Sequence, residues 1–588
     1  MRKTKIVCTL GPATDSPEVM REMILSGMNV ARFNFSHGSY DEHLKRLQLL
    51  RETSAQLGIP VASLMDTKGP EIRLGAFKGG RAVLKKDSRF LLTGDQVEGD
   101  ENRVSISFPE LYRDLHAGDR VLLDDGLIEL RVQSIEGNGI LCRVVNGGDI
   151  SDHKGVNVPD IALSMPYISP RDREDLLFAI QNDFDFIAAS FVRTAEDLAL
   201  VRRLMDEQGC HGIRLIAKIE NKQGVENIDE ILRISGGVMI ARGDMGVEIP
   251  LEEVPVIQKE IIKKAYGAGK FVITATQMLE SMMKNPRPTR AEATDVANAI
   301  YDGTSAIMLS GETAAGRYPV EALRTMATIA SRTERDIDYR GRFSRRSFPG
   351  KADITNAISH ATCTTALDLD ARAIITVTRS GTTARMISKY RPETPIIGCT
   401  YDPKVYRQLC ISWGVIPLLC EQKADTDSLF AHAVQRAQRE GLVDSGDLVV
   451  ITAGVPLGVS GTTNLLRVQT VGDILASGMG VNKLCCTGRA CVAQDTQSAQ
   501  ERFTTGDILV VPKTSNELLG LLKRASGIVA EQEGLNSHAA IVGMTLDIPV
   551  IVGAANATGM VKHSAAITVD AEKGVVLNAS GRQEEAGE

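Results

Sequence analysis

The feature that most constrains the fold is a regular alternation of short apolar runs and helical patterns from residue 1 to about 335. Runs such as KIVCTL, VASLMDT and FVITAT are hydrophobic almost throughout, which is typical of strands buried on both faces. Amphipathic stretches such as SPEVMREMILSG separate them. The candidate strands are 5–10, 30–36, 61–67, 186–192, 213–219, 237–245, 271–276 and 306–311. Eight such strands, each followed by a helix, predict an α/β fold with a (β/α)8 TIM barrel.

Three further regions interrupt or follow this rhythm. Residues 72–168 change to short β-like runs with Asp-Asp-Gly and Gly-Asn-Gly turns, which predicts a small β-barrel domain inserted in one barrel loop. Residues 341–473 again alternate helix and strand and predict an open α/β sheet, and residues 474–588 predict a further α/β domain. The barrel itself is therefore expected to comprise residues 1–71 and 169–340.

Composition excludes several functional classes. The 588-residue chain has a net charge of −7 and no long basic run, so a nucleic-acid partner is not expected. Neither a membrane-spanning apolar run nor a signal-peptide core is present in the sequence, and we expect a cytoplasmic protein without a membrane partner. The ten cysteines lie mostly in apolar runs and are expected to be reduced, and CCTGRAC (485–491) lacks the spacing of a metal site.

Polar residues gather where five of the predicted barrel strands end, and active sites of such barrels lie at the carboxyl ends of the strands. These residues are Arg32, Asn34 and Ser36 on the second strand, Asp66 and Thr67 on the third, Lys218 and Glu220 on the fifth, Arg242, Gly243 and Asp244 on the sixth, and Thr274 and Thr276 on the seventh. Lys68, Glu71 and Arg73 follow the third strand. Taken alone, Lys218 and Glu220 could equally be a surface ion pair, because positions i and i+2 of a strand share a face.

These residue types together indicate phosphoryl transfer. Glu220 and Asp244 offer two hard oxygen ligands for magnesium, with water and substrate supplying the rest. The oxygens of Asn34, Ser36, Asp66 and Thr67 suit a monovalent cation. Arg32, Arg73 and Lys218 supply positive charge for phosphate and carboxylate. The sequence contains no GxxxxGK[ST] loop and no kinase motif series, so a nucleotide must be bound in another way.

The motifs VARFNFSHG, LMDTKGPEIR, AKIENKQG, ARGDMGVE and TATQMLESM together resemble the pyruvate kinase family, in order and nearly intact. The resemblance implies transfer of the phosphoryl group of phosphoenolpyruvate to ADP, giving pyruvate and ATP. It also implies Mg2+ or Mn2+ and K+ as cofactors, and a homotetramer.

The resemblance also assigns roles to individual residues. It implies that Arg32 and Arg73 hold the transferring phosphoryl group and that Lys218 neutralises charge near the developing enolate. It implies substrate contacts for Gly243, Asp244 and Thr276, with Thr276 close to proton delivery. The implied metal ligands are Glu220 and Asp244 for the divalent ion, and Asn34, Ser36, Asp66 and Thr67 for K+. The implied nucleotide contacts are Asn34, His37, Arg73 and Lys154. The inserted domain is expected to act as a lid.

VTRSGTTARMISKYRP (377–392) reads as a strand, a polar turn and a helix, and backbone N–H groups at a helix N-terminus bind phosphate well. A simple capped turn would have the same pattern. The resemblance implies that a phosphorylated allosteric activator binds here, with the loop GVPLGVSGTTN (454–464) alongside. The expected contacts are Thr378, Ser380, Gly381, Thr382 and Thr383.

The last segment contains EGLNSHAAIVGMTLDIPVIVG (533–553), which resembles the swivelling phosphohistidine domain of phosphoenolpyruvate-utilising enzymes. That domain's histidine carries phosphate between distant sites, and His538 stands in its place. Since the chain has no ATP-grasp domain to charge it, we expect a structural or regulatory remnant. Two alternatives to an active allosteric kinase are a dikinase-like enzyme with His538 as carrier and a catalytically inactive regulatory protein.

Overall fold

The computed structural model describes residues 1–345, 353–423, 425–455, 463–472 and 474–578. The chain divides into two compact units, which are considered separately below. Unit 1 comprises residues 1–357, 378–393 and 400–419, and unit 2 comprises residues 358–377, 394–399 and 420–588. Residues 456–462 of the loop that we expected beside an effector lie outside the described residues.

A closed barrel of parallel strands forms the centre of unit 1, in the order β1-β17-β16-β15-β14-β13-β3-β2. The strands are β1 (Lys5–Thr9), β2 (Val30–Asn34), β3 (Ala62–Asp66), β13 (Phe186–Ala189), β14 (Arg214–Ile219), β15 (Gly237–Ala241), β16 (Phe271–Ala275) and β17 (Ala306–Leu309). All but the edge positions are buried, as the apolar runs predicted. The TIM barrel is therefore confirmed, with each of the eight predicted strands present.

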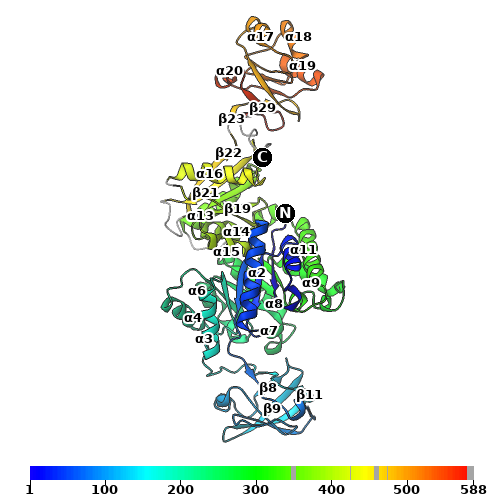
Figure 1. Ribbon diagram of the computed structural model, residues 1–588, viewed down its shortest axis with the longest axis vertical. Helices are drawn as coiled ribbons and strands as arrows, with labels where there is room; N and C mark the ends of the chain where they lie inside the picture. Colours follow the sequence, from blue (N-terminus) through cyan, green and yellow to red (C-terminus); the bar gives the residue numbers. More distant parts are fainter. Residues whose placement is uncertain (346–352, 424, 456–462, 473, 579–588) are drawn as a thin grey trace. The chain divides into compact units, whose positions relative to one another are not determined.

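Helices follow the strands and surround the barrel (Figure 1). They are α1 (Pro17–Leu25), α2 (Tyr40–Leu57), α3 (Pro170–Gln181), α4 (Ala195–Glu207), α5 (Lys222–Glu226), α6 (Ile228–Ile234), α7 (Arg242–Glu248), α8 (Val254–Gly267), α9 (Arg290–Asp302), α10 (Gly311–Ala314), α11 (Pro319–Asp336) and α12 (Tyr339–Arg345). Local sequence fixes their ends: Ser39 and Glu42 form a capping box at the start of α2, and Gly58 ends it in the left-handed conformation.

Two of the predicted strands end well before the expected residue, 192 for the fourth strand and 245 for the sixth. β13 ends at Ala189 and β15 at Ala241. Residues 242–245, which we predicted to continue the sixth strand, instead form the first turn of α7. The apolar run GVMIA itself ends at Ala241, and Arg242, Gly243 and Asp244 after it are partly exposed, so the predicted strand extended beyond the apolar run.

The region inserted after β3 is entirely β apart from short 3-10 turns. A seven-stranded sheet has the order β4-β12-β8-β9-β10-β6-β7, and β11 pairs with β5. The strands are β4 (Ile72–Arg73), β5 (Arg81–Leu84), β6 (Arg89–Thr93), β7 (Arg103–Ser105), β8 (Arg120–Leu123), β9 (Ile128–Glu136), β10 (Gly139–Asn146), β11 (Gly148–Ser151) and β12 (Gly155–Asn157). Asp124 and Asp125 adopt positive φ in the predicted Asp-Asp-Gly turn.

The rest of unit 1 comprises β20 (Val415–Leu419), α14 (Thr382–Lys389) and α15 (Pro403–Gln408). In unit 2, β18 (Ala373–Val377) pairs in parallel with β19 (Ile396–Thr400) and β21 (Leu448–Gly454), and β22 (Thr463–Thr470) is antiparallel to β21. These strands match the predicted α/β sheet. The remaining helices here are α13 (Ile354–Asp368), which begins in unit 1, and α16 (Thr426–Arg439).

The C-terminal part of unit 2 has a sheet of order β23-β30-β29-β25-β26-β27-β28-β24. Its strands are β23 (Ile474–Ser477), β24 (Met479–Gly480), β25 (Cys485–Val492), β26 (Ile508–Val511), β27 (Gly527–Ala530), β28 (Val550–Val552), β29 (Ala566–Asp570) and β30 (Val575–Asn578). Its helices are α17 (Thr496–Arg502), α18 (Leu519–Leu522), α19 (His538–Leu546) and α20 (Ala557–Met560). No helix in the described part of the chain is both long and apolar enough to cross a membrane.

Candidate active site

Lys218 is the centre of a buried charge cluster at the carboxyl end of the barrel. Its Nζ lies 2.9 Å from Asp66 Oδ1 and 3.1 Å from Glu220 Oε1, and all three residues are buried. Burial alone would lower the pKa of Lys218, but the carboxylates of Asp66 and Glu220 raise it above its ordinary value. Lys218 is therefore a permanent cation, and the alternative of a surface ion pair is wrong.

Glu220 is the least satisfied member of this cluster. Burial raises its pKa to about 7, the Lys218 cation works against this, and the carboxylates of Asp244 and Asp66 add to it. Its Oε2 accepts a hydrogen bond from the backbone of Phe191 at 2.6 Å, whereas its Oε1 accepts none from the described residues. Glu220 Oε1 has an ion-pair contact with Lys218 at 3.1 Å but no hydrogen bond from the described residues, and the charge of Asp244 reaches Glu220 as well; such a carboxylate fits a divalent cation.

Glu220 and Asp244 are the two predicted ligands. In the described part of the chain, no three His, Cys, Asp or Glu side chains converge on one point as a complete metal site. Two protein carboxylates with further ligands from substrate and water are the arrangement that magnesium commonly adopts in phosphoryl-transfer sites.

Asp66, at the end of β3, links the neighbouring strand β2 with β14, which lies beyond β13 in the barrel. Its Oδ2 accepts from Arg32 Nε at 2.6 Å, and its Oδ1 accepts from Lys218. Arg32 also donates to Thr9 Oγ1 at 3.0 Å. The structure thus brings Arg32 and Lys218 to the two oxygens of one carboxylate, and these contacts hold both cations in place.

Ser190 is a member of the cluster that sequence reasoning missed. Its hydroxyl lies 2.8 Å from Lys218 Nζ, 3.1 Å from Asp66 Oδ1 and 2.6 Å from the carbonyl of Thr67. A signal was present, because Ser190 is a polar residue within the apolar run 186–192, and β13 ends just before it. The five strand ends predicted to carry site residues did not include the fourth.

The residues predicted for K+ lie on adjoining strands. Asn34 ends β2, Asp66 ends β3, and their Cα positions pair across the two strands. Asn34 Oδ1 accepts from the backbone of Ser36 at 3.2 Å, and Thr67 Oγ1 accepts from the backbone of Ser190 at 3.0 Å. Both oxygens of Asp66 already contact cationic side chains, Arg32 and Lys218.

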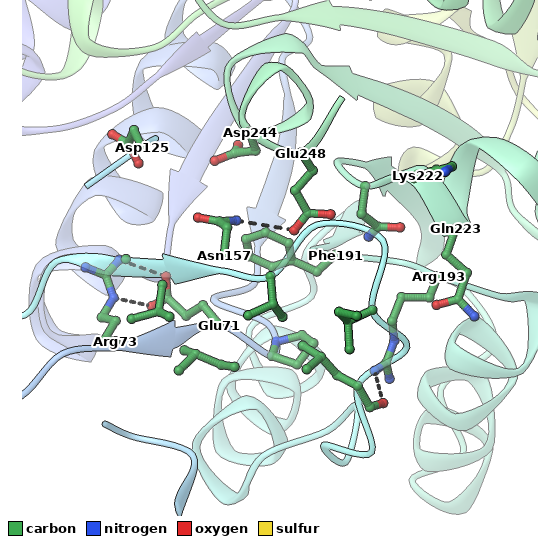
Figure 2. Close-up of a pocket in the computed structure, with 18 of the residues that line it drawn as sticks. Glu71, Arg73, Asp125, Asn157, Phe191, Arg193, Lys222, Gln223, Asp244 and Glu248 are labelled. Atoms are coloured by element: carbon green, nitrogen blue, oxygen red, sulfur yellow. Dashed lines mark hydrogen bonds and ion pairs between the residues drawn. The ribbon is translucent and has the colours of Figure 1, made fainter. Parts of the chain in front are cut away.

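A cavity of about 760 Å3 opens beside this cluster (Figure 2). Its lining comes from the barrel and from the inserted region, both of which belong to unit 1. The predicted residues that line it are His37, Arg73, Lys154 and Asp244. Phe191 also lines it, and its backbone N–H binds Glu220, so the buried cluster lies directly behind this part of the wall.

Arg73 faces Glu71 in this structure. Its Nε and one terminal nitrogen lie 2.7 and 2.8 Å from the two oxygens of Glu71 (Figure 2). The other terminal nitrogen donates to the carbonyl of His153. The hydrogen bonds to Glu71 raise the pKa of Arg73. Arg73 and Arg32 are therefore held by different carboxylates, Glu71 and Asp66.

Lys154 and His37 approach the cavity from different elements. Lys154, in the inserted region, pairs with Asp124 at 2.8 Å, and the carbonyl of His37 accepts from His43 Nε2 at 2.9 Å. Asn157 Nδ2 lies 3.3 Å from Glu248 Oε1 across the cavity wall (Figure 2). Burial raises the pKa of Glu248 to about 7, with the charges of Asp160 and Asp244 adding to it. Sequence reasoning missed Asn157 and Glu248.

The first turn of α7 is fixed against the end of β16. Thr276 has a φ of +68°, which is strained for a β-branched residue. Its hydroxyl accepts from the backbone N–H of Gly243 at 2.8 Å, and its carbonyl accepts from Arg242 at 2.7 Å. Arg242 is itself held by both oxygens of Asp295 at 2.7 Å. This network holds Gly243 beside Thr276, and Asp244 follows Gly243 in the same helical turn.

The predicted effector residues lie in a polar turn, residues 378–381, and in the first two residues of α14, Thr382 and Thr383. The hydroxyls of Ser380 and Thr382 are 2.9 Å apart, and Gly381 caps the helix with a φ of +75°. Thr378 and Thr383 are buried. Arg385 donates to the carbonyl of Ser380 and to Thr382 Oγ1, both at 3.1 Å.

His538 begins α19 in unit 2, where Ser537 caps the helix. Its Nδ1 lies 2.9 Å from Thr514 Oγ1, and its Nε2 lies 3.1 Å from Asn516 Oδ1. Both ring nitrogens therefore have a neutral partner.

Comparison with known proteins finds related domains in three parts of the chain. The pyruvate kinase barrel domain matches residues 1–323, the pyruvate kinase alpha/beta domain matches residues 356–469, and the mobile domain of PEP-utilising enzymes matches residues 503–574. A pyruvate kinase from Geobacillus stearothermophilus is 49% identical, and one from Bacillus licheniformis is 48% identical. The alignments cover 98% of this chain in both cases, and 98% and 99% of the relatives.

Solved structures agree with the sequence comparison. A crystal structure of a pyruvate kinase from Cryptosporidium parvum matches with a TM-score of 0.75 and 40% identity, covering 80% of this chain and 96% of that one. A barrel-domain match over more than half of the chain and relatives of this identity over nearly its full length establish the family. The chain therefore belongs to the pyruvate kinase family, whose members are phosphotransferases.

Proposed function

We propose that this protein transfers the phosphoryl group of phosphoenolpyruvate to ADP, forming pyruvate and ATP. The observation that carries the proposal is the buried position of Lys218 between Asp66 and Glu220, directly behind the wall of the cavity. A permanent cation held there by two carboxylates is preorganised to stabilise the negative charge that develops on an enolate oxygen.

The other residues take roles according to their position. Arg32 and Arg73 bind the phosphoryl group, which requires Arg73 to exchange Glu71 for substrate. Gly243 and Thr276 position the carboxylate of phosphoenolpyruvate. Thr276 lies on the side from which the enolate carbon receives its proton. Asn34, His37, Arg73 and Lys154 contact the nucleotide, and the inserted domain (72–168) closes as a lid that excludes water.

Glu220 and Asp244 are proposed to hold Mg2+ or Mn2+, and Asn34, Ser36, Asp66 and Thr67 to hold K+. When bound, these cations supply positive charge that offsets the phosphates and the developing enolate. The unsatisfied oxygen of Glu220 and its raised pKa support the divalent site.

We further propose allosteric activation by a phosphorylated metabolite at Thr378, Ser380, Gly381, Thr382 and Thr383, in a homotetramer of four domains per chain with the bounds given above. The turn before α14 supports this, because hydroxyls and the helix start gather there. A dikinase-like reaction through His538 is not favoured, since both ring nitrogens have neutral partners and no described cation contacts them.

A coupled assay of ADP-dependent pyruvate formation tests the proposal. Turnover that requires phosphoenolpyruvate, ADP, Mg2+ and K+ is expected. Absence of turnover under these conditions would favour the inactive regulatory protein, and phosphate-dependent formation of AMP would favour the dikinase.

A further inference from the structure

A second polar cavity lies far from the active site, at the amino end of β16. It is formed within unit 1 by the residues that precede and begin β16, by α14 and by the segment around Trp413. Four cationic side chains line it, namely Lys270, Arg385, Lys389 and Arg391. No aspartate or glutamate lines it, so its charge is strongly positive.

Three of these cations have only neutral acceptors as partners. Lys270 Nζ donates to the carbonyl of Ser235 at 2.6 Å, and Arg385 donates to Ser380 and Thr382. Lys389 Nζ donates to Asn356 Oδ1 at 3.0 Å. Within the described ranges, none of the three forms an ion pair. Buried or half-buried cations in proteins are normally paired, so the missing negative charge needs an explanation.

The pKa values of these cations are lowered, so burying them together disfavours their charged forms. Burial lowers the pKa of Lys270, and the charges of Arg385 and Arg214 lower it further. Burial and the charge of Arg214 also lower the pKa of Arg385 well below its ordinary value. For Lys389, burial again lowers the pKa, and the charge of Asp353 opposes this. An anion among these groups would relieve their repulsion.

Ser412 provides an independent sign of a ligand. It is 3% exposed, it lines the same cavity, and its hydroxyl has no hydrogen-bond partner among the described residues. A buried hydroxyl that lacks a partner costs free energy unless another group binds it. A hydroxyl next to four cations is a suitable donor for an oxyanion.

The backbone is also adapted to this close approach. Gly269 has a φ of +70°, and a Cβ at this position would lie 3.0 Å from the sulfur of Met386 on α14. Glycine therefore allows the chain to turn against the helix and to bring Lys270 to Arg385 and Lys389.

We propose that this cavity is a binding site for a phosphate group, supplied by inorganic phosphate or by a small phosphate monoester. Several arginine and lysine side chains with one hydroxyl match the charge and the acceptor oxygens of phosphate. The cavity measures about 10 Å3, which is room for about one water. Binding of phosphate therefore requires the long side chains of Lys270 and Lys389 to move outward.

This site differs from the proposed effector turn and does not depend on it. The turn offers the hydroxyls of Thr378, Ser380, Thr382 and Thr383, none of which lines the cavity. The two are connected, however. Arg385 and Arg214 both donate to the carbonyl of Ser380, and Arg214 begins β14, the strand that carries Lys218. Phosphate bound to Arg385 would therefore alter the hydrogen bonding at the carbonyl of Ser380, where the turn contacts β14.

Calorimetric titration of the full-length protein with inorganic phosphate, at constant ionic strength in chloride, tests the proposal. Saturable binding is expected, weakened about tenfold or more by Lys270→Met and by Ser412→Ala, because each removes a donor to a charged ligand. Lys263→Met, which removes an exposed lysine of α8, is the matched control and should bind normally. Ser412→Ala is small enough to keep the protein folded if Lys270→Met does not.

Crystals soaked in phosphate locate the ion, and glycerol phosphate in the same titration distinguishes the two sources. Tighter binding of the monoester that also depends on Lys270 and Ser412 would identify a metabolite, and tighter binding of inorganic phosphate would identify the free ion. No binding to the unaltered protein, equal binding by all three variants, or density confined to the active site or the turn 378–383 would overturn the proposal.

Discussion

Replacing Lys218 by methionine tests the central assignment, because methionine keeps the length and apolar stem but removes the charge. Lys218 is the cation in contact with Glu220 and one of two in contact with Asp66. Loss of one preorganised donor to a developing oxyanion costs about 2.7–4 kcal/mol of transition-state stabilisation, or about 10²–10³ in turnover, and a dry site extends this toward ~10⁴.

The affinity for phosphoenolpyruvate should change little, since the charge is needed mainly in the transition state. Asp66 keeps its contact with Arg32, so we expect the variant to stay folded. Turnover and KM are measured by coupled assay, and the melting temperature by calorimetry. Lys264→Met, which removes an exposed lysine that pairs with Asp229 on the barrel surface, is the control and should have normal turnover. Near-normal turnover in Lys218→Met, or a higher KM with unchanged turnover, would refute the reasoning.

Three further predictions concern other parts of the chain. Glu71→Lys should relax the K+ requirement, because a tethered ammonium replaces the charge of the ion; unchanged K+ dependence of activity would count against the proposed K+ site. Glu248 has a folded pKa raised to about 7, so the stability that it contributes is present at low pH and is lost as the pH rises through about 7. As the pH rises toward about 7, the melting temperature of Glu248→Gln should fall less steeply than that of the unaltered protein. An equally steep fall would contradict the raised pKa of Glu248. His538→Ala should leave turnover nearly intact, whereas deletion of residues 474–588 should alter stability or the effector response. If radiolabel from phosphoenolpyruvate appeared on His538 as fast as the enzyme turns over, the carrier hypothesis would be right.

The barrel could be predicted because its signal is local. A run such as KIVCTL is apolar on both faces, and this feature alone indicates a strand covered by helices on one side and by the barrel core on the other. The shared face of Lys218 and Glu220 could likewise be predicted from the two-residue period, and the structure places their charged atoms 3.1 Å apart.

The contacts of Asp66 could not be predicted in the same way. They depend on which strands are neighbours and on their register: Asp66 pairs with Ala188 of β13 and Asn34 of β2. These are long-range relationships that no local pattern carries. For the same reason the pairing of Arg73 with Glu71, and the hydrogen bond of Asn157 to Glu248, appear only in the folded chain.

The charges at the strand ends explain why this site calls for a metal ion. Asp66, Glu220 and Asp244 are three carboxylates. Among the described residues, Arg32 and Lys218 form ion pairs with Asp66, Lys218 also pairs with Glu220, and Arg73 is engaged by Glu71. The excess negative charge falls on Glu220, whose pKa is raised to about 7 and whose Oε1 accepts no hydrogen bond from the described residues. Phosphoenolpyruvate and ADP would bring still more negative charge to the same place. The divalent cation proposed at Glu220 and Asp244 would offset part of this negative charge.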